Sequence, residues 1–324
     1  MAKILVIGGA GYIGSHVVLE LLEKNHQVIV FDNLSTGQRE NLFNEAEFVE
    51  GDILDFEKLK NVMKQNIDVV IHLAAKKAVG ESMEKPAIYA SNNITGSINI
   101  LNAMIEADVK NIVFSSSAAV YGMPQYLPID EKHIKNPINF YGYTKSLIED
   151  LIIWYSKLKD INYFIFRYFN AVGYDSHKRV KGKEKNPQNL LPIIMEVATK
   201  KRDCLQIYGN DYDTKDGTCE RDYIHVSDLA TAHEKAVQKL MEENGSHILN
   251  LGTGRGTSVQ EIVDSSEKII SQKLNYSYAP RRSGDPAVLV ASSDLAHMVL
   301  NWKPKYTNIE DIIQTTWNME KNNG

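Results

Sequence analysis

The feature that most constrains this chain is a glycine-rich segment directly after a short apolar run near its start. Residues 4–7 are all apolar, and Gly8, Gly11 and Gly14 follow. Glycines at this spacing let the backbone turn tightly between a strand and a helix, so that helix N-terminal amides can face a pyrophosphate. Asp32 ends the next apolar run, where a carboxylate accepts hydrogen bonds from ribose hydroxyls and repels a 2′-phosphate. The sequence therefore predicts a dinucleotide site that prefers NAD to NADP.

The first half of the chain alternates short β-rich runs with longer amphipathic stretches, as in a parallel sheet covered by helices. We expect strands at residues 4–7, 27–31, 47–50, 68–74, 111–115 and 163–169. We expect helices at residues 11–24, 56–65, 86–107 and 141–158, and later at 190–199 and 227–241, with a late strand at 248–252. The predicted fold class is α/β, a doubly wound, Rossmann-like parallel sheet with a smaller C-terminal substrate-binding lobe.

The polarity of the chain changes after Asn170, which suggests two lobes. We expect residues 1–169 to form the NAD-binding domain and 227–250 to rejoin it, with 170–226 and 251–324 forming the substrate-binding lobe. The segment 171–189 is polar, and we expect a mobile, solvated loop there. Its basic residues are Lys178, Arg179, Lys181, Lys183 and Lys185.

Composition excludes several classes of protein. The chain has 324 residues, a net charge of −5 and a pI near 6.0, so no global basic field favours nucleic acid or an acidic membrane surface. Cys204 and Cys219 are too few for a disulfide framework and lack metal-ligand spacing, so no metal site is predicted. No apolar run approaches the roughly 20 residues that span a bilayer, and no signal-peptide pattern follows Met1. We expect a cytoplasmic protein.

Tyr141 and Lys145 stand four residues apart on a predicted helix and so share one face. An ammonium group beside the phenol favours the phenolate, which could then act as a base on an alcohol. Lowering the phenol pKa from about 10 to about 7 needs about 4 kcal/mol, which Lys145 and a cationic nicotinamide ring could supply together. Ser117 lies at the carboxyl end of the fifth predicted strand, close to where Tyr141 begins its helix.

Further cofactor contacts are expected where strands end. Asp52 and Ile53 follow the third predicted strand, where the adenine should lie. Leu73, Ala74 and Ala75 follow the fourth, and their small side chains allow close approach of the pyrophosphate. We interpret His72 and His225, which flank apolar runs, as structural histidines.

These motifs together resemble the extended short-chain dehydrogenase/reductase superfamily, whose serine, tyrosine and lysine triad matches Ser117, Tyr141 and Lys145. Within it, five segments resemble the UDP-glucose 4-epimerase family: 77–82, 115–122, 167–170, 221–226 and 279–285. The resemblance implies reversible epimerisation at C4 of UDP-glucose and UDP-galactose, by transient hydride transfer to tightly bound NAD through a 4-keto sugar. It also implies a homodimer.

The resemblance implies ligand contacts as well. For NAD they are Tyr12, Ile13, Asp32, Asn33, Asp52, Ile53, Lys77, Asn92 and Lys145, with Phe169 on the nicotinamide side. For the UDP-sugar they are Asn170, Asn189, Leu190, Gln206, Ile207, Tyr208, Arg221, Arg282 and Asp285. Arginine guanidinium groups suit phosphate oxygens, and Asp285 suits a ribose. Either arginine could instead form an ion pair within the protein.

Several departures and alternatives remain open. Phe140 stands where the family often has proline, and the basic segment replaces one that is commonly acidic. Leu289 aligns near a sugar-pocket position that is tyrosine in some members, so we hypothesise tolerance of an N-acetyl group at C2. UDP-glucuronate is a separate alternative substrate, for which we identify no residues that would receive the C6 carboxylate. A nucleotide-sugar 4,6-dehydratase needs an acid and a base where this chain has Ala118 and Ala119. A non-catalytic NAD-sensing protein could dispense with Tyr141.

Overall fold

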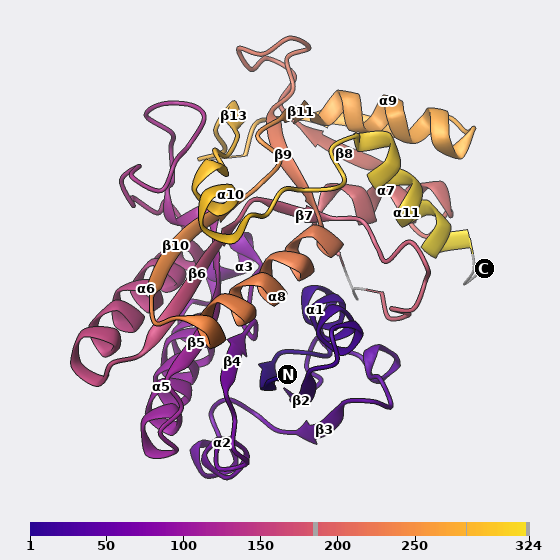
Figure 1. The fold of residues 1–324 in the computed structure, drawn as a ribbon. Helices are drawn as coiled ribbons and strands as arrows, with labels where there is room; N and C mark the ends of the chain where they lie inside the picture. Colours follow the sequence, from indigo (N-terminus) through magenta and orange to yellow (C-terminus); the bar gives the residue numbers. More distant parts are fainter. Residues whose placement is uncertain (184–186, 283, 322–324) are drawn as a thin grey trace.

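The computed structural model describes residues 1–183, 187–282 and 284–321. Its centre is a seven-stranded parallel sheet in the order β3-β2-β1-β4-β5-β6-β10 (Figure 1). These strands are β1 (Lys3–Ile7), β2 (Gln27–Asp32), β3 (Glu47–Glu50), β4 (Val69–His72), β5 (Asn111–Ser117), β6 (Asn162–Tyr168) and β10 (Ser246–Leu251). The predicted doubly wound α/β fold is confirmed.

Helices cover both faces of the sheet. On one face lie α1 (Tyr12–Glu23) and α8 (Val226–Glu242), and on the other lie α2 (Phe56–Met63), α5 (Gly96–Glu106) and α6 (Phe140–Lys159). Successive side chains of a strand point to opposite faces. In β1, Ile4 and Val6 pack toward α1 and α8, whereas Leu5 and Ile7 pack toward α2 and α5. Burial on both faces explains why these strands are continuous apolar runs in the sequence.

The predicted helix at 86–107 is interrupted. The structure has α4 (Pro86–Tyr89), a π-helical turn at Ala90–Thr95 and then α5. The helix α3 (Val79–Glu84) precedes it and was not predicted, because six residues are too few for a clear helical period. Short 3-10 turns occur at Arg39–Asn41 and Ala118–Val120. The π-helical turn buries Asn93, which becomes important in the site.

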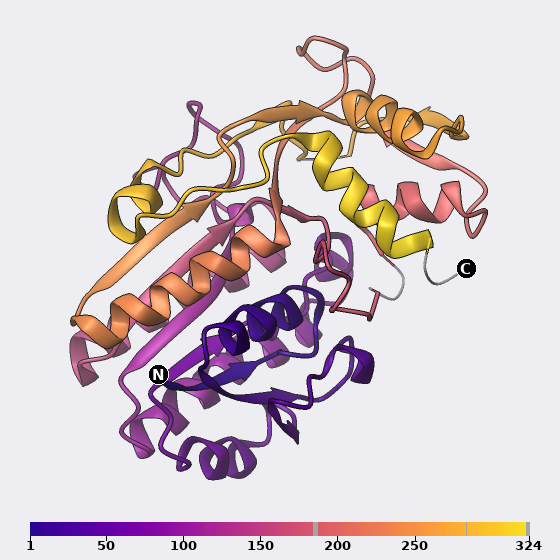
Figure 2. The same cartoon turned by 45° about the vertical axis from the view of Figure 1, so that its right-hand side comes forward.

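A second group of elements lies beyond the sheet (Figure 2). The strand β9 (Glu220–His225) pairs with β7 (Asn170–Val172), β11 (Gly256–Ser258) and β13 (Val288–Leu289), and β8 (Leu205–Tyr208) pairs with β12 (Tyr276–Ala279). The helices here are α7 (Leu190–Ala198), α9 (Val259–Ile270) and α11 (Ile309–Lys321), whereas α10 (Asp294–Leu300) packs against β10 and α8 of the main sheet. The predicted return of the chain to the sheet corresponds to α8 and β10, which pairs with β6. The exact lobe boundaries stay a prediction.

The basic segment differs from the solvated loop that was expected. Val180 is fully buried, and Arg179 forms ion pairs with Asp175 and Glu23. Lys183 Nζ lies 2.7 Å from a carboxylate oxygen of Glu320. The described part, 178–183, is therefore anchored to α1 and α11. The sequence did not show this, because Glu23 and Glu320, which hold it on these helices, are far away in the chain. The predicted basic residue Lys185 lies outside the described residues.

No helix in the described part of the chain is both long and apolar enough to span a membrane.

The glycine-rich loop allows a direct test of the fold. A β-carbon at Gly14 would lie 2.1 Å from the carbonyl oxygen of Gly8, so the backbone of the loop must shift. We expect Gly14→Ala to lower the free energy of unfolding by about 1–3 kcal/mol and to reduce the NAD retained on purification. Gly80→Ala is the control, because among the described residues its β-carbon would meet nothing within 4 Å. Equal effects of the two changes, in thermal melting and NAD content, would contradict the packing argument.

Candidate active site

The site forms where the end of β5 meets the start of α6. Asn139 caps this helix by accepting a hydrogen bond from the Gly142 amide at 2.8 Å. One turn into the helix, Lys145 donates from Nζ to the carbonyl oxygen of Ser115 at 2.5 Å. The Ser117 hydroxyl is hydrogen-bonded to the phenol of Tyr141. The structure thus brings the serine, tyrosine and lysine singled out in the sequence into one cluster, in which Lys145 is buried and Ser117 and Tyr141 are half-buried.

Gly142 makes this approach possible. A β-carbon there would lie 2.4 Å from the carbonyl oxygen of Ala119. Only a glycine lets α6 pack this closely on the 3-10 turn at Ala118–Val120. Neither Ala118 nor Ala119 has a titratable group, so this turn offers no acid or base for eliminating water.

Electrostatics at the cluster differ from the simplest sequence expectation. Burial raises the pKa of Tyr141, and the hydrogen bond with Ser117 opposes this shift. Burial also lowers the pKa of Lys145 to about 7, which the nearby Glu149 carboxylate opposes. Lys145 Nζ lies 6.0 Å from the centre of the Tyr141 ring. The Lys145 ammonium group therefore acts on the Tyr141 phenol through space rather than by a direct hydrogen bond. Burial disfavours both the phenolate and the ammonium form. A further positive charge is therefore needed to form the phenolate at neutral pH.

A buried ion pair behind Lys145 was missed from the sequence. Arg167 and Glu149 are both almost fully buried, and their charged groups form a bidentate pair at 3.0 and 2.7 Å. The Ser116 hydroxyl donates to the same carboxylate at 2.5 Å. Arg167 also donates to the Tyr121 hydroxyl at 3.0 Å. Residues 116 and 167 lie side by side on paired strands, a relation that depends on sheet register.

Asn93 is a second residue that was missed. Its amide accepts from the backbone amide of Lys76 at 2.8 Å and donates to the Lys76 carbonyl at 3.0 Å. It also donates to Thr144, whose hydroxyl bonds to the Tyr141 carbonyl at 2.7 Å. Asn93 therefore joins the loop after β4 to the helix of Tyr141. The neighbouring Asn92, which was predicted to contact NAD, is half-buried and donates to Asn93 at 3.0 Å.

The cofactor end is built on the glycine-rich loop. Gly8 has φ +88°, and a β-carbon there would lie 2.7 Å from the Ala74 amide nitrogen, so the loop after β4 packs against it. Asp32 at the end of β2 accepts from the amides of Ala10 and Leu34 at 3.0 and 2.8 Å. Burial raises the pKa of Asp32, and these two bonds oppose the shift. Gly11 precedes α1 and has no side chain to cap its first amides.

The other predicted cofactor residues surround the same edge of the sheet. Asn33 donates to Asp52 at 2.7 Å, and Ile53 packs under Gly96 of α5. Leu73 and Ala74 are tied by their amides to the carbonyl of the last β1 residue. Tyr12 and Ile13 begin α1, and Ala75 and Lys77 lie in the loop after β4. Phe169 is buried directly after β6. These features fit NAD. The glycine-rich loop and the uncapped N-terminus of α1 suit its pyrophosphate, and the Asp32 carboxylate at the end of β2 suits its ribose.

The predicted substrate residues lie on the second group of elements. Gln206 and Tyr208 face outward from β8, whereas Ile207 is 1% exposed and points into the hydrophobic core. Only the backbone of Ile207 can therefore meet a ligand without rearrangement. Arg282 lies over the ring of Tyr208, 3.9 Å from its centre. Asn170 begins β7, and Asn189 and Leu190 begin α7.

Arg221 forms an ion pair within the protein, which was the alternative to phosphate binding considered from the sequence. It is 8% exposed, and its guanidinium lies 2.8 Å from a carboxylate oxygen of Asp285. The two residues that were predicted to hold different parts of the UDP-sugar thus pair with each other. A phosphate group approaching Arg221 would have to share or replace this bond. Such a pair keeps a buried guanidinium neutralised and oriented.

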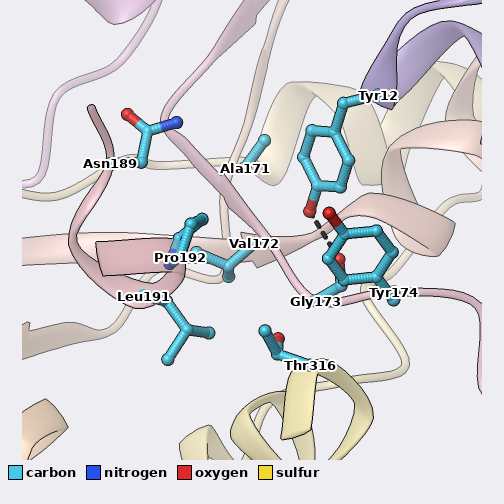
Figure 3. Close-up of a pocket in the computed structure, with 9 residues that line it drawn as sticks. All are labelled: Tyr12, Ala171, Val172, Gly173, Tyr174, Asn189, Leu191, Pro192 and Thr316. Atoms are coloured by element: carbon cyan, nitrogen blue, oxygen red, sulfur yellow. Dashed lines mark hydrogen bonds between the residues drawn. The ribbon is translucent and has the colours of Figure 1, made fainter. Parts of the chain in front are cut away.

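A small cavity of about 10 Å³ lies between residues predicted to contact the cofactor and residues predicted to contact the substrate (Figure 3). Tyr12 and Asn189 lie on different sides of it, and the Tyr12 hydroxyl donates to the Gly173 carbonyl at 2.5 Å. This volume is close to what one water molecule requires. The predicted cofactor residue Tyr12 therefore contacts the segment that leads to the predicted substrate residues.

The fold and this cluster define a class of protein, a Rossmann-type enzyme with a tyrosine, lysine and serine site beside a dinucleotide cradle. Over residues 4–252 the chain matches the NAD dependent epimerase/dehydratase family. It is 46% identical to the UDP-glucose 4-epimerase of Halalkalibacterium halodurans over 320 residues, which cover 98% of this chain and 95% of that protein. The chain therefore belongs to the NAD dependent epimerase/dehydratase family.

Solved structures agree with this assignment. The crystal structure of UDP-glucose 4-epimerase from Brucella ovis in complex with NAD has a TM-score of 0.95 and 43% identity, with 98% of each chain covered. That of the Bifidobacterium longum UDP-glucose 4-epimerase in complex with NAD+ and UDP has a TM-score of 0.94 and 37% identity, with 99% of this chain and 98% of that chain covered.

Lys145 gives a pH-dependent prediction. Its pKa falls from 10.5 to about 7 on burial, so the unfolded chain binds more protons between these two values and stability rises with pH across that window. Lys145→Met removes this dependence. We expect the variant to be more stable than the wild type at pH 6, with a gap that narrows toward pH 10. Thermal melting of both proteins across this range checks it, and a gap that widens with pH would contradict it.

Proposed function

We propose that this chain catalyses the reversible epimerisation at C4 of UDP-glucose and UDP-galactose, with NAD retained through the cycle. The contact of Tyr141 with Ser117, beside the buried Lys145, is the observation that carries the proposal. Tyr141 would be the base and Ser117 the hydrogen-bond donor for the C4 hydroxyl of the sugar, next to the glycine-rich loop that fits NAD. The family and the relatives named above support the same reaction.

In this mechanism, NAD held at the glycine-rich loop would supply the acceptor, and later the donor, of the C4 hydride. Tyr141 as phenolate removes the proton of the C4 hydroxyl, and Ser117 hydrogen-bonds the same oxygen. Lys145 supports the phenolate through its charge. After the resulting 4-keto sugar turns its other face, Tyr141 gives the proton back, and the configuration at C4 is inverted.

Substrate residues complete the proposal. Arg221 and Arg282 would hold the diphosphate, and Asn170, Asn189 and the outward edge of β8 would hold the rest of the UDP-sugar. The hexose must turn within the site, so most binding energy belongs on the nucleotide rather than on the reacting ring. Arg282 over Tyr208 suits this role, because the contact aligns a guanidinium without burying it in an ion pair.

We also propose that the functional unit is a homodimer. Tyr143, Trp154 and Leu158 on α6 are 49, 58 and 68% exposed. Apolar side chains this exposed on one long helix suit a helix-to-helix contact between two copies.

Conversion of UDP-galactose tests the proposal. Purified protein incubated without added NAD should form UDP-glucose until the two sugars reach a stable mixture, as measured by chromatography. No conversion, even with NAD supplied, would overturn the assignment to these sugars and leave the NAD-sensing alternative. Tyr141→Phe is the matched variant, since it removes one oxygen. We expect it to bind NAD and to lose about 10²- to 10⁴-fold in kcat.

Leu289 favours a second substrate. It lies half-buried in β13 and packs against the hydrophobic cluster that contains Ala118 and Phe169. A leucine leaves more space than a tyrosine, so we propose that UDP-N-acetylglucosamine is also converted. Chromatography of the products checks this. Conversion of UDP-galactose without any conversion of the N-acetyl sugar would contradict it, and Leu289→Tyr should abolish only the second activity.

A further inference from the structure

Residues 175–183, here called the strap, return from the second group of elements to the NAD-binding half (Figure 2). The backbone amide of its first residue, Asp175, donates a hydrogen bond to Nε2 of His16 on α1 at 3.0 Å. Arg179 binds Asp175 and reaches Glu23 at the end of α1. Near its end, the Gly182 amide donates to the side-chain oxygen of Asn41 at 2.7 Å. The strap thus crosses α1 and ends beside the loop that follows β2.

Asn41 connects the strap to the glycine-rich loop. Its side chain is 4% exposed, and its amide nitrogen donates to the Ala10 carbonyl at 3.0 Å. The Gln38 amide donates to the same carbonyl at 3.0 Å. The Ala10 amide in turn donates to Asp32, the carboxylate expected at the ribose. One buried side chain therefore holds the middle of the cofactor loop and the strap together.

Gly182 fits this contact. A β-carbon there would lie 2.6 Å from the Asn41 side-chain oxygen, so the strap backbone reaches the amide only because the residue is glycine. A buried amide whose donor and acceptor are both used is costly to disrupt, because breaking either bond leaves a buried polar group unpaired.

We infer that Asn41 is a positioning residue that locks the glycine-rich loop to the strap and thereby slows the release of bound NAD. NAD held by this loop can leave only when the loop or the segment after β2 moves. Asn41 links both to a third segment that is anchored on α1 by Arg179. Release of NAD then requires the glycine-rich loop, the segment after β2 and the strap to open together. This inference concerns NAD retention alone and involves no UDP-sugar.

Exchange of bound NAD tests the inference. The full chain, purified with NAD, is mixed with excess 1,N6-etheno-NAD, and bound nucleotide is quantified after gel filtration at successive times. Asn41→Ala should exchange NAD at least about tenfold faster than the wild type, since it removes two buried hydrogen bonds. Asn44→Ala is the matched control, because Asn44 is exposed three residues further on.

Arg179→Ala provides an independent variant. Arg179 is 38% exposed, so its loss loosens the strap on α1 without opening a core. It should also speed NAD exchange, by a smaller factor than Asn41→Ala. Wild-type exchange rates in both variants would overturn the inference, even if the Asn41 variant melts at a lower temperature. If Asn41→Ala does not fold, the exchange rate of Arg179→Ala decides alone.

Discussion

The attachment of α6 to the end of β5 is the contact on which the site depends. Tyr141, Lys145 and Glu149 are spaced four residues apart and share one face of the helix. Each is held by a different residue of the strand: Ser117 and Ser116 use their hydroxyls, and Ser115 uses its carbonyl. This arrangement sets the reacting phenol by the same contacts that pack the helix on the sheet.

This attachment places charges where water is excluded. Burial favours the neutral forms of both Tyr141 and Lys145. Glu149 favours the ammonium form of Lys145, and Arg167 neutralises Glu149 in turn. The protein therefore prepares a phenol that ionises readily only when another positive charge arrives. An oxidised nicotinamide ring would carry such a charge, so in the proposed mechanism Tyr141 would become an active base together with the hydride acceptor.

Short-range sequence patterns were enough to predict the features that depend only on residues close together in the chain. The strand at Glu47–Glu50 and the glycine-rich loop follow from periodicity and from backbone geometry, and the tyrosine and lysine follow from helical spacing. Asn93 could not be predicted, because its role depends on a π-helical turn inside an otherwise regular helix and on Lys76 and Thr144. The Arg221 and Asp285 pair was only one of two options, because 64 residues separate the partners.

The ionisation of Tyr141 tests the central claim most directly. Ultraviolet titration of the NAD-loaded wild type, with the spectrum of Tyr141→Phe subtracted, isolates this phenol from the other tyrosines. The account predicts an apparent pKa well below the value of about 10 for a free phenol, because the cationic nicotinamide ring and Lys145 together outweigh the effect of burial. It also predicts a return toward the usual value in Lys145→Met. A phenol that titrates at 10 or above in the NAD-loaded wild type would contradict it.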